Sequence, residues 1–182
     1  MLSRRLLTIT LLFALVLSGA ATPPKEHFGF TPGDDYKLAD YEQVASYFHK
    51  LAKESPRIRV EEFGKSAEGR PMLAAFISSE ANLKRLDHWK EMNRKMALGL
   101  ASPEEAERYA REGKAIVWID SGLHSTEVAP VQHAPRLAYT MVTGETEEIK
   151  RIRENVILVQ VPVINPDGRS EEHTSELQSP NT

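Results

Sequence analysis

The sequence has 182 residues and a formal net charge of −3, with 41% hydrophobic and 27% charged residues. This is the composition of an ordinary globular domain, and the length suffices for one hydrophobic core. The slightly acidic balance argues against a nucleic-acid partner, because such surfaces are normally basic. Since the chain has no cysteine, a disulfide framework and a thiolate metal site are both excluded, and any metal has to be held by histidine and carboxylate.

The chain opens with the pattern of a secretory signal peptide over residues 1–21. Arg4 and Arg5 form a short positive region, residues 6–17 are apolar, and small residues follow. The apolar stretch is short for a membrane span. We therefore expect cleavage at the end of this segment, a secreted or periplasmic protein, and no membrane span after cleavage. An uncleaved amino-terminal anchor is the alternative.

The next hundred residues alternate between helical and strand patterns. Residues 22–35 are rich in proline and glycine and are expected to form an extended lead-in. Asp40 is placed to cap a helix over residues 41–52, where apolar side chains recur at helical spacing. Residues 58–63 alternate as in a half-buried strand, and residues 71–77 predict a second strand antiparallel to it.

Residues 79–114 are expected to form a helical excursion. Its second helix has a clear start, with Ser102 as the cap, Pro103 in the first helical position and Glu105 completing a capping box. The polar run over residues 108–114 indicates that this helix lies on the surface.

The remaining pattern predicts strand, helix, helix, strand. The apolar run over residues 115–119 predicts a buried strand, and residues 128–142 a buried helix. A short charged helix over residues 146–155 is followed by a near-continuous apolar strand, 156–163, of the kind buried on both faces. The fold class is therefore α/β, with three α/β/α layers around a mixed sheet.

His124 and Glu127 follow the predicted strand 115–119, with two residues between them. Three residues apart on one turn, an imidazole and a carboxylate can point at a common centre, and both are good zinc ligands. They lie just past the carboxyl end of a strand, where open α/β sheets bind their ligands. The spacing alone is a weak pattern, because a solvated surface pair shows it too.

Three blocks give this pair a context: GKSAEGRP at residues 64–71, GLHSTE at 122–127 and NPDG at 165–168. In this order they resemble the zinc carboxypeptidases of the M14, carboxypeptidase A-like family. The resemblance places a truncated peptidase domain at residues 36–169 and implies the phosphorylase/hydrolase-like fold. It also implies a Zn²⁺ ion held by His124 and Glu127. The implied activity is hydrolysis of a peptide bond at a chain terminus by metal-activated water, with peptides or proteins as substrates.

The resemblance also implies groups that this chain lacks. In the family a third zinc ligand, a histidine, and the catalytic glutamate lie further downstream, so we expect the chain as given to be inactive. Thr126 stands where several members carry arginine, which leaves the preferred C-terminal amino acid open. The alternatives are a zinc amidohydrolase of the deacylase type, acting on small acylated amino acids, and a non-catalytic secreted binding domain on the same scaffold.

The last stretch, residues 170–182, reads as the in-frame translation of a common sequencing adapter. We expect it to be an artefact appended to a truncated gene, with a genuine polar tail as the alternative. On either interpretation, His173 is not taken as a metal ligand.

The other candidate side chains have simpler interpretations. Arg70 and Glu68 are expected to pair locally, and Asp167 to hydrogen-bond its own backbone within a turn. Asp120 is placed to orient a ligand. His133 is expected to be a core or rim histidine of the helix 128–142.

Overall fold

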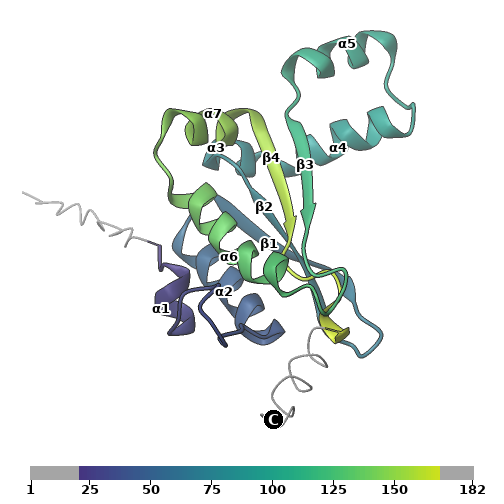
Figure 1. The fold of residues 1–182 in the computed structure, drawn as a ribbon. Coiled ribbons are helices and arrows are strands. Elements are labelled where there is room, and N and C mark those ends of the chain that lie inside the picture. Colours follow the sequence, from purple (N-terminus) through teal and green to yellow (C-terminus); the bar gives the residue numbers. More distant parts are fainter. Residues whose placement is uncertain (1–20, 169–182) are drawn as a thin grey trace, which may run out of the picture.

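The computed structural model of the chain describes residues 21–168. The expected signal peptide, apart from Ala21, and the segment 170–182 lie outside these residues. In chain order the elements are α1 Pro24–Phe28, α2 Tyr41–Glu54, β1 Ile58–Lys65, β2 Pro71–Ile77, α3 Glu80–Lys84, α4 Leu86–Ala97, α5 Pro103–Glu112, β3 Ala115–Asp120, α6 Val128–Thr143, α7 Glu147–Asn155 and β4 Val156–Val161 (Figure 1).

The four strands form one mixed sheet in the order β1-β2-β4-β3. β2 pairs antiparallel with both β1, as predicted, and β4, whereas β3 runs parallel to β4. The carboxyl ends of β3 and β4 therefore lie at the same end of the sheet, and the turn between β1 and β2 also lies there (Figure 1). The candidate site is at this carboxyl end of the sheet.

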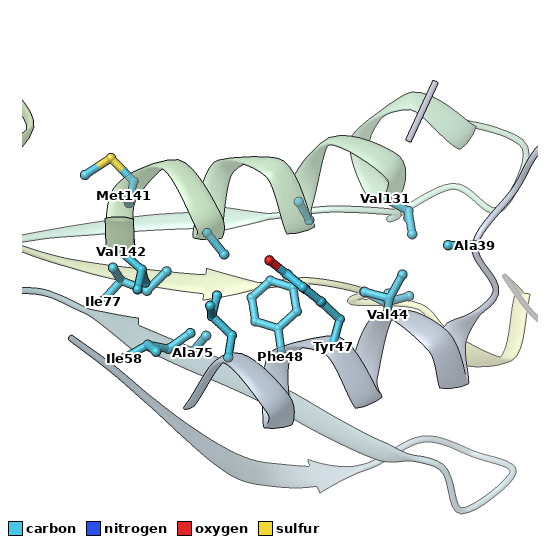
Figure 2. Close-up of a cluster of buried hydrophobic side chains, with 14 of the residues drawn as sticks. Ala39, Val44, Tyr47, Phe48, Ile58, Ala75, Ile77, Val131, Met141 and Val142 are labelled. Atoms are coloured by element: carbon cyan, nitrogen blue, oxygen red, sulfur yellow. The ribbon is translucent and has the colours of Figure 1, made fainter. Parts of the chain in front are cut away.

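Helices α2 and α6 cover one face of the sheet and enclose the main core (Figure 2). α2 begins where predicted, because the Asp40 side chain accepts a hydrogen bond from the Gln43 amide at 2.7 Å and completes a capping box. Its apolar stripe faces the sheet, so that Val44, Phe48 and Leu51 are fully buried. The helical periodicity in the sequence thus identified the buried face of α2.

The lead-in is not extended throughout, so that prediction is wrong for residues 24–28. They form the short helix α1, with Pro24 in its first turn and Gly29 ending it at a φ of 76°. Phe28 is only 8% exposed, and its ring centroid lies 5.5 Å from that of Tyr47. The lead-in folds because its aromatic side chain is part of the core.

The second face of the sheet is covered only in part. Leu86, Trp89 and Met92 of α4 pack against Ile157 of β4. α5 has no buried residue and begins with the predicted Ser102 capping box. Figure 1 shows α4 and α5 extending away from the sheet. The architecture is α/β with helices on both faces, as predicted, and its second helical layer is small.

The prediction of a buried strand at residues 115–119 is wrong, because all six residues of β3 are exposed. Trp118 has 56% of its surface accessible. Within residues 21–168, β3 is an edge strand that pairs on one side only, with β4, and its side chains remain exposed on both faces. The central strand is instead β4, which is buried as predicted from Ile157 to Val161.

α6 runs from Val128 to Thr143 and continues past Pro135. Only one face of it is buried, along a stripe that includes Val131, Ala134 and Ala138. His133 lies on the opposite face and is exposed, so it is not a core histidine. Among residues 21–168, no helix is both long and apolar enough to cross a membrane.

Candidate metal centre

The three sequence blocks meet at the edge of the sheet where β3 and β4 end (Figure 1). The first block forms the turn between β1 and β2, and the other two follow β3 and β4. Neighbouring parallel strands finish at the same end of the sheet, so the loops that follow them lie close together. Open α/β sheets bind ligands at this end. Sheet topology therefore places residues 66–70, 121–127 and 164–168 together.

The loop that follows β3 is held by backbone hydrogen bonds to the chain after β4. The Ser121 amide donates to the Val161 carbonyl at 3.1 Å, and the Ile164 amide donates to the Ser121 carbonyl at 2.8 Å. Gly122 then adopts a φ of 69°, and a Cβ atom there would lie 2.5 Å from Cγ2 of Val131 in α6. Glycine meets both the conformational and the steric requirement of this bend.

His124 and Glu127 lie on a single turn of this loop, as their spacing predicted. The Glu127 amide donates to the His124 carbonyl at 3.2 Å, which closes the turn immediately before α6. The two side chains meet with His124 Nδ1 3.0 Å from Glu127 Oε1. They are 67% and 56% exposed, so an ion or substrate from solvent has access to both.

The donor chemistry of this pair fits zinc, which accepts imidazole nitrogen and carboxylate oxygen. A catalytic zinc normally has three protein ligands. Within residues 21–168 no group of three or more His, Cys, Asp or Glu side chains is placed to hold a metal ion. His124 and Glu127 therefore supply two suitable ligands without a third.

Asp167 connects the chain after β4 to the β1–β2 turn. Its Oδ1 accepts hydrogen bonds from Ser66 Oγ and Arg70 Nη1, both at 2.7 Å, and its Oδ2 accepts from the Glu68 amide at 3.1 Å. Arg70 also pairs with the Glu68 side chain, as predicted. The expectation that Asp167 hydrogen-bonds its own backbone is wrong, because its carboxylate instead accepts from donors about a hundred residues earlier in the sequence.

These contacts set the charge state of the cluster formed by Asp167, Arg70, Ser66 and Glu68. Desolvation acts to raise the pKa of Asp167, but the hydrogen bonds from Ser66, Arg70 and the Glu68 amide outweigh it, so this pKa lies below its ordinary value. The hydrogen bond to Asp167, followed by that to Glu68, raises the pKa of Arg70. The cluster is therefore a charged, hydrogen-bonded link at neutral pH.

Asn165 connects the same segment to residues 121–127, the candidate metal loop. Its Nδ2 donates to the Leu123 carbonyl at 3.3 Å, and its Oδ1 accepts from the Gly168 amide at 3.2 Å. Asp120, expected to orient a ligand, is exposed at the end of β3 and makes no hydrogen bond to His124 or Glu127 within the described chain. Sequence reasoning missed the role of Asn165, although its block had been singled out.

This mixed sheet with helices on both faces is the fold of solved carboxypeptidases. The chain is similar to carboxypeptidase A from Helicoverpa armigera, with 24% identity and a TM-score of 0.54 over 82% of this chain and 32% of that one. It is also similar to thrombin activatable fibrinolysis inhibitor, with 13% identity and a TM-score of 0.52 over 81% of this chain and 31% of that one. The chain thus spans about a third of the length of each.

Residues 44–181 match the model of the zinc carboxypeptidases, peptidase family M14, and the chain belongs to this family. The match includes all of the loop that carries His124 and Glu127. A comparison with curated proteins finds no match. The family assignment therefore comes from the family model and the fold from the solved structures.

Proposed function

We propose that this chain carries the amino-terminal part of a metallocarboxypeptidase domain, in which His124 and Glu127 are two of the zinc ligands. The observation that supports this most directly is their geometry: the side chains meet at 3.0 Å, on one turn at the carboxyl edge of a parallel strand pair. The match of residues 44–181 to the zinc carboxypeptidases supports the interpretation of this pair as zinc ligands.

In this proposal His124 binds the metal through an imidazole nitrogen and Glu127 through a carboxylate oxygen. When bound, zinc supplies a Lewis acid and lowers the pKa of water, which makes water a nucleophile at neutral pH. Because both side chains are largely exposed, a peptide from solvent can reach the proposed metal position. The proposed substrates are peptides or proteins, cleaved at a chain terminus.

With two ligands in place of three, the site should bind zinc weakly. A third protein ligand contributes enthalpy and fixes the geometry in advance, and residues 21–168 offer none. We expect the 182-residue chain to show no peptidase activity, because a catalytic zinc normally has three protein ligands and residues 21–168 place only two at this site.

Zinc titration calorimetry on the 182-residue chain tests the ligand assignment. We expect weak binding that His124→Ala and Glu127→Ala both abolish. His133→Ala is the matched control, because this histidine is also exposed and lies outside the turn, on the outer face of α6. Unchanged zinc binding in both loop variants would remove the assignment, and equal loss in His133→Ala would show non-specific histidine binding.

The reaction class is tested on a protein that contains the complete domain. A blocked peptide with a free carboxyl terminus should be cleaved, whereas a small acylated amino acid should not. The family match favours the peptidase over the deacylase alternative. The reverse preference would support the deacylase, and zinc binding without either activity would support a binding domain.

We also propose that the protein is secreted or periplasmic, on the sequence of residues 1–21 alone. Fused to a reporter, this segment should direct export and be removed. Recovery of an intact amino terminus in the membrane fraction would contradict the proposal.

A further inference from the structure

We infer that Asp167, together with Ser66 and Arg70, is a positioning network for the metal loop. It holds the β1–β2 turn against the chain after β4, and that chain in turn holds the loop of His124 and Glu127. The inference rests on the proposed zinc site and assigns residues that act on its geometry without touching the metal.

The first link is the attachment of Asp167 to the β1–β2 turn. Both carboxylate oxygens are used, by donors from Ser66, Glu68 and Arg70 at 2.7 to 3.1 Å. The Asp167 side chain is 17% exposed and that of Arg70 is 27% exposed, so water competes little for these bonds. Ser66 Oγ also accepts from the Arg70 amide at 3.0 Å, which ties the two donors to each other.

The second link is the contact between the chain after β4 and the metal loop. Asn165 donates to the Leu123 carbonyl, one residue before His124. A Cβ atom on Gly168 would lie 3.1 Å from Cβ of Ser125, one residue after His124, so the two backbones are close. A shift of the Asp167 segment therefore changes the position of the loop on both sides of His124.

The third step concerns what else holds the metal loop. The His124 and Glu127 side chains are largely exposed, so they have little packing of their own. Glu127 precedes α6 without a side-chain capping bond. Metal sites require their ligands to be held within about 0.5 Å, and surrounding hydrogen bonds normally provide this. In this loop the contacts from residues 164–168 contribute to it, together with the backbone hydrogen bond from Ser121 to Val161.

The test compares Asp167→Asn with a control that breaks a similar ion pair far from the site. Glu145→Gln is that control: Glu145 Oε1 lies 2.6 Å from Arg57 Nη1, just before β1 begins and therefore at the end opposite the metal loop. We measure zinc affinity by calorimetry, the absorption spectrum of bound Co²⁺, and the free energy of unfolding. All variants are made in the 182-residue chain.

We expect Asp167→Asn to weaken zinc binding by about tenfold, the range seen when residues that support metal ligands are lost. The Co²⁺ spectrum should change as well, because the ligand geometry relaxes. Ser66→Ala, which removes one of the three donors, should give a smaller loss in the same direction. Glu145→Gln should leave both metal readouts unchanged, even where it lowers stability.

Unchanged zinc affinity and Co²⁺ spectrum in Asp167→Asn, with binding lost in His124→Ala, would overturn the inference and leave the zinc site intact. Unchanged binding in His124→Ala would overturn the zinc site itself. If Asp167→Asn does not fold, Arg70→Lys takes its place, since it keeps the charge and loses the planar geometry of the contact. Weaker zinc binding in Arg70→Lys supports the network, and wild-type zinc affinity with an unchanged Co²⁺ spectrum in that variant contradicts it.

Discussion

Arg70 Nη1 lies 2.7 Å from Asp167 Oδ1, although 97 residues separate the two in sequence. This ion pair joins the first and last of the three sequence blocks, and the loop of His124 and Glu127 is the neighbour of the last. Its two members come from the β1–β2 turn and from the chain after β4, the strand that neighbours β2 in the sheet. The candidate metal centre thus depends on a contact between distant parts of the chain.

The first prediction concerns stability in acid. The pKa of Asp167 is lowered in the folded chain, so its charged form stabilises the fold above the unfolded-state value of about 3.9. That contribution is lost as the pH falls through the lower, folded-state pKa. We expect Asp167→Asn to be less stable than the wild type near neutral pH and to lose less stability on acidification.

Urea unfolding at several pH values between about 2 and 7 measures this difference. Asp35→Asn is the control, because Asp35 is exposed before α2 and has no ion pair within residues 21–168. Parallel stability profiles for wild type and Asp167→Asn would contradict the prediction.

The second prediction concerns Gly122. Alanine there must adopt a φ near 69° and brings its Cβ to 2.5 Å from Val131 Cγ2. We expect Gly122→Ala to lower the free energy of unfolding by about 1–3 kcal/mol. Gly99→Ala separates the two causes, since Gly99 has a φ of 66° and nothing within 4 Å of its Cβ position. Equal losses in the two variants would leave no role for the contact with Val131.

The third prediction concerns Arg153, which is 4% exposed although it belongs to the charged helix α7. Its guanidinium donates to the carbonyls of Met141, at 3.0 Å, and of Gly144, at the end of α6. Arg153→Met keeps the apolar stem and leaves these carbonyls without that donor, which should cost about 1–3 kcal/mol of unfolding free energy.

Arg151→Met is the matched control, because Arg151 lies on the same helix and is exposed. We expect its unfolding free energy to stay within about 0.5 kcal/mol of the wild type. Denaturant titration of the three proteins gives the comparison, and a loss no larger in Arg153→Met than in Arg151→Met would show that the buried bonds add nothing.

The fourth prediction concerns the edge strand β3. Ile116, Val117, Trp118 and Ile119 are 42%, 41%, 56% and 37% exposed on a strand that pairs on one side only. Such an edge promotes association. We expect the 182-residue chain to self-associate with increasing concentration, as measured by analytical ultracentrifugation.

Trp118→Lys should reduce this association, because a charge on the edge opposes pairing with another chain. Leu98→Lys is the control, since Leu98 is 62% exposed but follows α4 and is not part of the edge strand. A wild-type chain that stays monomeric up to about 1 mM would contradict the prediction.

What the sequence determined by itself lies within a few residues along the chain. The cap at Asp40, the capping box at Ser102 and the stripe of α2 follow from interactions between residues three or four apart. His124 and Glu127 share a turn for the same reason, so the sequence alone identified the pair proposed to bind zinc. Alternation and apolar runs also identified the four strands found within residues 21–168.

Burial and long-range pairing were decided by the tertiary structure alone. The apolar runs of β3 and β4 look alike in sequence, yet β4 is central and β3 is at the edge, because strand order depends on which segments meet across the sheet. Arg153 belongs to a segment that the sequence shows only as a short charged helix, yet its side chain is buried and bonds to the end of α6. Asp167 finds its donors in a turn nearly a hundred residues earlier. The spacing of residues along the sequence cannot identify such partners, because they come together only when the sheet forms.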